Sequence, residues 1–121
     1  MTIKELKKIY NEVGPFSEGR FWVKLNDRKG HVDKNGNITT PIIYDWVGCF
    51  HEGRAWAELN GEWGYIDLNG KVIIPLIYDF VRDFSKGKAE VRIGKYKLNI
   101  DRNGFPISKI SLLKLFKGIF E

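Results

Sequence analysis

Cysteine, histidine and long apolar runs are scarce in this chain of 121 residues. The single cysteine, Cys49, excludes an internal disulfide framework and favours a reducing compartment. No window contains the roughly 18 consecutive apolar residues that a transmembrane helix requires. The first ten residues carry lysines between Ile3, Leu6 and Ile9, and they lack the apolar core and the cleavage site of a signal peptide. We therefore expect a cytoplasmic protein.

What the chain has in abundance is internal repetition, with a period of 34 residues and no insertions. A tyrosine opens each copy and divides the chain into residues 10–43, 44–77 and 78–107, with short ends at 1–9 and 108–121. Four further columns stay in register, namely Phe16, Phe50 and Phe84, then Gly19, Gly53 and Gly87, then Asp33, Asp67 and Asp101, and finally Gly36, Gly70 and Gly104. A tandem repeat therefore fills most of the molecule.

The content of each copy is typical of β-strands. Residues 55–59 alternate apolar and polar side chains, and residues 72–74 are β-branched, while no stretch shows helical spacing over three turns. Each copy also contains Asn-Gly, at 35–36, 69–70 and 103–104, which predicts a type I′ turn. We predict an all-β fold of three tandem 34-residue β-hairpin-based repeats, either stacked openly or closed in a pseudo-threefold barrel or trefoil-like arrangement.

The second copy carries a recognisable motif. It reads Gly-Arg-Ala at 53–55, Trp-Gly-Tyr-Ile-Asp at 63–67, Gly-Lys-Val-Ile-Ile-Pro at 70–75 and Tyr-Asp at 78–79. This pattern resembles the WG or KWG repeats of bacterial proteins, although the Trp-Gly signature becomes Lys-Gly at 29–30 and Lys-Leu at 97–98. The resemblance implies a binding or scaffolding array, and it brings no catalytic residues with it.

Residues 108–121 break the period and have the pattern of an amphipathic helix. One broad face is apolar and consists of Leu112, Leu113, Leu115, Phe116, Ile119 and Phe120. Because stacked repeats expose an apolar end, we expect this helix to act as a C-terminal cap, with a dimerisation helix and a cationic membrane-surface helix as alternatives. Residues 1–9 are expected to cap the other end, as a short helix or a strand.

Charge is unevenly distributed among the copies. The formal net charge is +5, yet residues 44–77 contain two basic and five acidic side chains while residues 78–107 contain seven and four. A nucleic-acid groove would need a continuous basic stripe, which the acidic middle copy interrupts. We therefore do not expect nucleic acid as a partner.

Alternation along the first strand of each copy separates two faces. The inward face is expected to hold Phe21, Val23, Leu25, Ala55, Ala57, Leu59, Ala89, Val91 and Ile93. The opposite face then presents Trp22 and Trp56 at equivalent places, beside Arg20 and Arg54. Tryptophan and arginine are enriched where partners anchor, so this face is a candidate partner site, unless a neighbouring layer covers it.

A second candidate patch lies on the following strand. Trp63 and Tyr65 are aromatic only in the middle copy, where the first copy has Lys29 and His31. Such an asymmetry favours a local contact with a ligand or partner, together with Tyr44 and Trp46, over a role shared by all repeats.

Two short motifs suggest chemistry and fail on inspection. The Asp-x-Asn-Gly segments lack the acidic twelfth residue of an EF-hand, so we expect their aspartates to bond the backbone of a tight turn. Cys49 and His51 share a face on an extended segment, but no third orienting group accompanies them. His31 and His51 occupy unrelated repeat positions, so we expect no metal, no cofactor and no enzyme activity.

The sequence predicts a non-catalytic protein–protein interaction module of the WG-repeat type. The expected contacts with an unidentified protein partner are Arg20, Trp22, Arg54, Trp56, Trp63 and Tyr65. One alternative is a membrane-peripheral protein that uses residues 108–121, and another is carbohydrate or small-ligand binding by the aromatic side chains. Homodimerisation through the tail is a further expectation.

Overall fold

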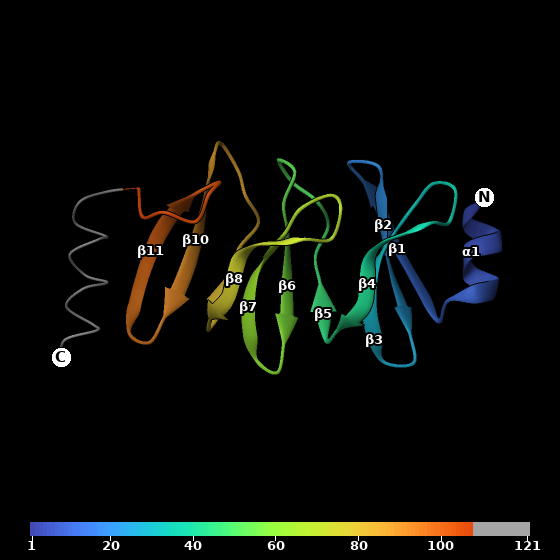
Figure 1. Ribbon diagram of the computed structural model, residues 1–121, viewed down its shortest axis with the longest axis horizontal. Helices are drawn as coiled ribbons and strands as arrows, with labels where there is room; N and C mark the ends of the chain where they lie inside the picture. Colours follow the sequence, from blue (N-terminus) through green and yellow to red (C-terminus); the bar gives the residue numbers. More distant parts are fainter. Residues whose placement is uncertain (108–121) are drawn as a thin grey trace.

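The structure is a computed structural model that describes residues 1–107. These residues form three antiparallel sheets that stand side by side along the longest axis, with one short helix at the amino-terminal end (Figure 1). Each sheet comes from one repeat, which confirms the predicted mostly-β, three-repeat fold. The strands of each sheet form an open series with two edges, so the closed barrel or trefoil-like alternative is wrong. The helix expected over 108–121 lies outside the described residues.

Strands within a sheet follow one another in chain order. The first sheet consists of β1 (Glu12–Ser17), β2 (Arg20–Leu25), β3 (Arg28–Asp33) and β4 (Ile38–Tyr44). The second consists of β5 (Trp46–Val47), β6 (Ala55–Leu59), β7 (Glu62–Ile66) and β8 (Val72–Tyr78). The third sheet contains, within the described residues, β9 (Phe80–Val81), β10 (Lys88–Ile93) and β11 (Tyr96–Asp101). The repeat unit is thus a meander of consecutive hairpins.

The turn types differ from the predicted ones. Two-residue turns with positive φ at both positions join the first two strands of each sheet, at Glu18-Gly19, Glu52-Gly53 and Lys86-Gly87. These are type I′ turns, and the two-residue turns Asn26-Asp27 and Asn60-Gly61, which join β2 to β3 and β6 to β7, also have positive φ at both positions. In the Asn-Gly segments at 35–36, 69–70 and 103–104 only the glycine has positive φ, so the prediction of type I′ turns at these three places is wrong.

A carboxylate explains why the Asn-Gly loops take another form. Asp33 Oδ1 accepts hydrogen bonds from the backbone N–H groups of Asn35 and Asn37, at 2.9 and 3.0 Å. The same pair of bonds recurs at Asp67 and Asp101. The interpretation of these aspartates as turn-stabilising residues is confirmed.

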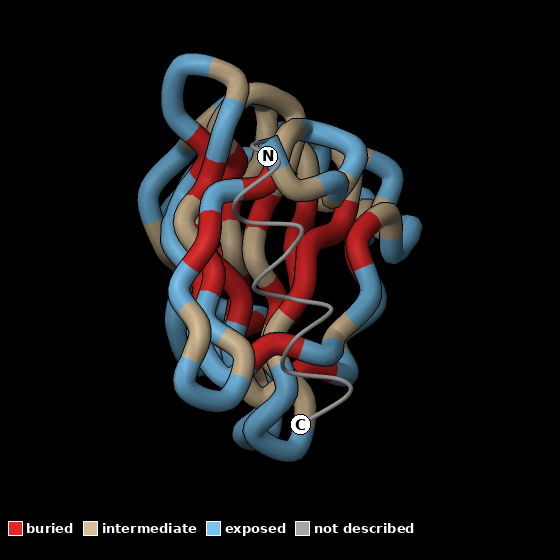
Figure 2. Tube along the Cα trace, turned by 90° about the vertical axis from the view of Figure 1, so that its left-hand side faces the viewer, coloured by how far each residue is buried: buried red, intermediate tan, exposed pale blue. Residues whose placement is uncertain are grey.

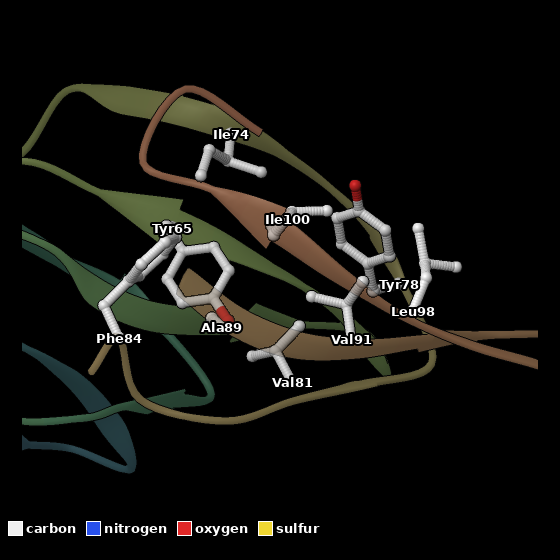
Figure 3. Close-up of a cluster of buried hydrophobic side chains, with 9 residues drawn as sticks. All are labelled: Tyr65, Ile74, Tyr78, Val81, Phe84, Ala89, Val91, Leu98 and Ile100. Carbon is white, nitrogen blue, oxygen red and sulfur yellow. The ribbon is translucent and has the colours of Figure 1, made fainter. Parts of the chain in front are cut away.

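Three apolar cores lie between the layers. The first joins the helix to the first sheet and includes Leu6, Tyr10, Phe21, Val23 and Val32. The second joins the first two sheets and includes Val47, Phe50, Ala55, Ala57 and Ile66. The third joins the last two sheets, and Figure 3 shows its side chains. Viewed from the end of the stack, buried segments run through the middle while exposed turns form the periphery (Figure 2).

The amino-terminal layer is α1 (Ile3–Ile9). Thr2 begins it as the N-cap, because its hydroxyl accepts a hydrogen bond from Glu5 N at 3.1 Å. Leu6 is fully buried against the first sheet and stands in the repeat position of Thr40 and Ile74. The helical alternative for residues 1–9 is therefore present, and α1 occupies the place that β4 and β8 take in the following layers.

The glycine of the Trp-Gly signature marks a place where two strands touch. A β-carbon at Gly64 would lie 2.5 Å from the carbonyl oxygens of both Ile74 and Pro75, and Gly30 is equally confined. Pairing of β7 with β8 shifts register at this point. In the third repeat the position is Leu98, which is buried in the last core.

The outer face of the third sheet is polar. Glu90 lies 3.2 Å from Arg82 and 3.3 Å from Lys97, and exposed side chains surround it, among them Lys88, Arg92 and Asn99. Within residues 1–107, this end of the stack therefore presents charge. Apolar side chains are exposed at the same end, namely Phe80, Phe105 and Ile107. Capping by residues 108–121 lies outside the described residues and stays a prediction.

Candidate binding groove

Trp22 and Trp56 lie flat across the strand or loop beside them. Trp22 covers Gly14 and Trp56 covers Gly48, and a β-carbon at either glycine would overlap the indole ring. Both tryptophans are half-buried, since Trp22 packs on the second core and Trp56 on the third. The neighbouring layer therefore covers part of each tryptophan ring, and the remaining part of each ring stays accessible.

The predicted arginines connect neighbouring repeats. Arg20 Nε donates to the carbonyl of Leu68 at 3.1 Å, and Arg54 Nε donates to the carbonyl of Arg102 at 2.9 Å. Each bond joins a sheet to the β-turn loop of the next repeat, 48 residues further along the chain. Both arginines therefore link neighbouring repeats, and both stay half-buried, so their role as partner contacts remains a prediction.

Sequence analysis missed two glutamates with the same role. The Glu18 carboxylate accepts bonds from the backbone N–H groups of Glu52 and Gly53, both at 2.7 Å. Glu52 in turn accepts one from Gly87 at 2.8 Å and pairs with Arg102. The Arg102 bond, and then the Gly87 bond, hold the pKa of Glu52 below its usual range. The sequence pattern that could have indicated this role is the glutamate that precedes the turn glycine in the first two copies, in Glu18-Gly19 and Glu52-Gly53.

Tyr65 is a core residue. Its side chain is fully buried, and its hydroxyl donates to the carbonyl of Arg82 at 2.6 Å. Burial, followed by the charge of Asp83, raises the pKa of this phenol. We correct Tyr65 from a candidate surface contact to an inter-repeat hydrogen bond, because the third sheet covers the strand face on which it lies (Figure 3).

Trp63 fills the junction between the second and third sheets. Its ring centroid lies 4.9 Å from that of Trp56 and 5.6 Å from that of Phe80. At the equivalent place of the first repeat, Lys29 Nζ lies 3.3 Å from the ring centroid of Trp46. Both arrangements place an aromatic contact at a sheet junction, so Trp63 supports the rings that reach the surface.

An open groove of about 310 Å³ brings the remaining candidate residues together. We call it the tryptophan groove, since Trp22, Trp46 and Trp56 line it, and its wall includes Cys49, His51 and Asp83. Trp46 is the most accessible of the three rings, with 51% of its surface exposed. Of the predicted contacts, Trp22 and Trp56 reach this groove.

Polar groups at the groove wall do not form an activated nucleophile. His51 Nε2 lies 3.5 Å from Asp83 Oδ2, and Cys49 shares the wall with them. Burial, and then the charge of Asp83, raise the pKa of the Cys49 thiol, which favours its protonated form. The described part of the chain contains no group of three or more His, Cys, Asp and Glu side chains placed to hold a metal ion.

No helix among residues 1–107 is long and apolar enough to cross a membrane.

Comparison with known proteins identifies the repeat. No curated protein and no solved structure matches the chain significantly. The family model described as WG containing repeat matches residues 6–28, 30–63 and 63–96, which together span most of the chain. The second and third matches each begin in one sheet and end in the next, since residues 30–63 run from β3 to β7 and residues 63–96 from β7 to β11. Because the three matches together cover more than half of the chain, the chain belongs to the WG containing repeat family.

Proposed function

We propose that this repeat domain is a non-catalytic interaction module that binds another protein through the tryptophan groove. The observation that carries the proposal is the convergence of Trp22, Trp46 and Trp56 on one open groove. Tryptophan is the side chain most enriched at binding hot spots, where a large ring is desolvated against a partner. A repeat array holds such rings on rigid strands, so a partner would meet a preformed surface.

Trp46 is the residue that tests the proposal. Trp22 and Trp56 pack on the sheet cores, so replacing them would also weaken the fold. Trp46 is half-exposed, which allows Trp46→Ala to remove a groove wall while keeping the stack. The matched control is Phe105→Ala, since Phe105 is an aromatic side chain with 66% exposure on the loop of the third repeat.

The experiment captures proteins from a lysate of the source cell on the immobilised wild-type chain and on both variants, each checked by circular dichroism. A partner retained by the wild type and by Phe105→Ala is then purified for calorimetric titration. We expect Trp46→Ala to weaken its binding by about tenfold or more. Equal affinity for all three chains would contradict the proposal.

A second candidate function is carbohydrate or small-ligand binding. It requires aromatic rings that line a groove, and Trp22, Trp46 and Trp56 do so. Titration with soluble glycans while tryptophan fluorescence is recorded tests this candidate, and it fails if no glycan gives a saturable change that Trp46→Ala abolishes.

A membrane-peripheral role would depend on residues 108–121, which lie outside the described residues. We keep it as a proposal, together with homodimerisation through the same segment and a cytoplasmic location. Sedimentation with anionic vesicles at low and high salt tests the lipid role, because electrostatic attachment weakens as salt rises.

A further inference from the structure

The third repeat supplies its own cation at the place that corresponds to the tryptophan groove. Counting 34 residues onward, Phe80 replaces Trp46, Arg82 replaces Gly48 and Glu90 replaces Trp56. The guanidinium carbon of Arg82 lies 5.6 Å from the centroid of the Phe80 ring, and Arg82 Nε lies 3.2 Å from Glu90 Oε2. An arginine therefore sits between an aromatic ring and a carboxylate there.

The second repeat keeps the aromatic surroundings and lacks a cation at the position that corresponds to Arg82. Gly48 has no side chain, and the groove beside it is lined by three indole rings instead of one phenyl ring. Indole is the aromatic group with the strongest attraction for cations. Trp46 already accepts one from within the chain, since Lys29 Nζ lies 3.3 Å from its centroid.

A carboxylate at the wall gives the groove its negative charge. Asp83 comes from the third repeat, lines the groove and has about half of its side-chain surface exposed. Its charge reaches the buried side of the wall as well, because it raises the pKa of both Cys49 and Tyr65. The positive charge of Lys29, which lies against Trp46, opposes the negative charge of Asp83. The Lys29 side chain is buried, and its Nζ lies 3.4 Å from the carbonyl oxygen of Asp45.

We propose that the tryptophan groove binds an arginine side chain of the partner, with the guanidinium against the indole rings and Asp83 as its counter-charge. Arginine fits better than lysine, because a planar guanidinium stacks on aromatic faces and pairs with a carboxylate at the same time. The inference rests on the proposed function and names the group that the groove recognises.

The test uses N-acetyl-arginine methylamide as the probe and N-acetyl-citrulline methylamide as its neutral isostere. Binding is followed by the indole N–H signals in NMR spectra of the labelled full chain, assigned with single tryptophan variants. We expect saturable shifts for Trp46 and Trp56 with the arginine probe, and about tenfold weaker binding of the citrulline probe. Equal binding of both probes, or no saturable shift up to about 50 mM probe, would overturn the inference.

Two variants sharpen the result. Asp83→Asn keeps the shape of the groove, removes its charge and should weaken the arginine probe several-fold while leaving the citrulline probe unchanged. Glu62→Gln removes a charge on an exposed residue of β7 outside the groove lining and should change neither. An Asp83→Asn chain that binds the arginine probe as well as the wild type does would contradict the assignment of the counter-charge.

The double variant Gly48→Arg, Trp56→Glu copies the Arg82–Glu90 pair into the second repeat and fills the groove from within. Circular dichroism should show it folded, with a lower urea midpoint than the wild type because Trp56 packs on the third core, and it should lose the arginine probe. Retained binding of the probe by this folded variant would overturn the inference. The proposed function is judged separately, because a partner that depends on Trp46 but tolerates replacement of its arginines would uphold the groove and reject its specificity.

Discussion

His31 and Tyr65 occupy the same repeat position and satisfy the same buried carbonyl of the next layer. His31 Nε2 donates to Gly48 O at 2.8 Å, as the Tyr65 hydroxyl does to the carbonyl of Arg82. His31 Nδ1 lies 3.0 Å from the Thr40 hydroxyl, which donates to it when the ring is neutral. Burial lowers the pKa of His31 to about 4, although the hydrogen bond to the Gly48 carbonyl acts in the opposite direction and raises it. A buried carbonyl needs a donor, and two side chains of different chemistry supply it.

The depressed pKa of His31 predicts a loss of stability in mild acid. The unfolded chain takes up the proton near pH 6.5 and the folded chain only near pH 4, so this stabilisation is complete above pH 6.5 and falls as the pH drops through that window. The full loss is roughly 3 kcal/mol. Urea unfolding at pH 7 and pH 5 should show the decline. The double variant His31→Tyr, Thr40→Ile, which copies Tyr65 and Ile74, should flatten it, and an unchanged decline would contradict this account.

Gly64 and Gly53 are glycines for two different reasons, close contact with a neighbouring strand at Gly64 and a positive φ at Gly53. Gly64→Ala places a β-carbon against two backbone carbonyls that cannot move aside, so we expect a loss of about 3 kcal/mol in the free energy of unfolding. Gly53 has φ of 77° and open space around it, so Gly53→Ala should cost only about 1 kcal/mol of backbone strain. Denaturant titration of both variants checks the order, and an equal loss would mean that contact is not the reason for Gly64.

At the scale of elements, the repeats are joined by side chains that reach forward along the chain. Glu18 and Glu52 bond the type I′ turn of the following repeat, and Arg20 and Arg54 bond its Asp-x-Asn-Gly loop. Gly70 fits against the backbone of Thr39 in the preceding sheet. The preceding layer therefore positions the turn and the loop of each repeat. These bonds stabilise the stack, in which no single sheet could bury an apolar core by itself.

Glu52 makes the largest number of contacts among these links, and we expect its removal to destabilise the junction between the second and third repeats. Glu52→Gln loses the ion pair with Arg102 and weakens the bond to Gly87 N. We expect a lower urea midpoint and faster hydrogen exchange at the Lys86-Gly87 turn. Glu62→Gln removes a charge from an exposed position of the same repeat and serves as the control. Equal midpoints for the two variants would show that the link contributes nothing measurable.

At the scale of the molecule, each sheet has two different faces and the stack repeats them in order. The Trp56 face of the second sheet packs on the third sheet, whose own corresponding face carries exposed charges such as Lys88 and Arg92. A further copy would therefore fit between existing sheets. Polar outer faces are how repeat arrays end without aggregating.

Duplicating residues 44–77 after position 77 should give a folded chain with one more sheet. The inserted copy finds a Trp56 face before it and the third repeat after it, as the original does. Small-angle scattering should show a longer particle, and urea unfolding should remain cooperative at a higher midpoint. An inserted segment that exchanges its amides like an unfolded chain would contradict the stacking order.

The amino-acid sequence by itself determined the 34-residue period, the β content, the positions of the turns and the buried face of Phe21 and Val23, because these follow from local pattern. Only the tertiary structure decided the fate of the opposite face. Whether a strand face meets water depends on the next sheet, which no local period reports. That layer buried Tyr65, engaged Arg20 and Arg54, and brought Trp46 of β5 beside Trp22 and Trp56 in one groove with Asp83.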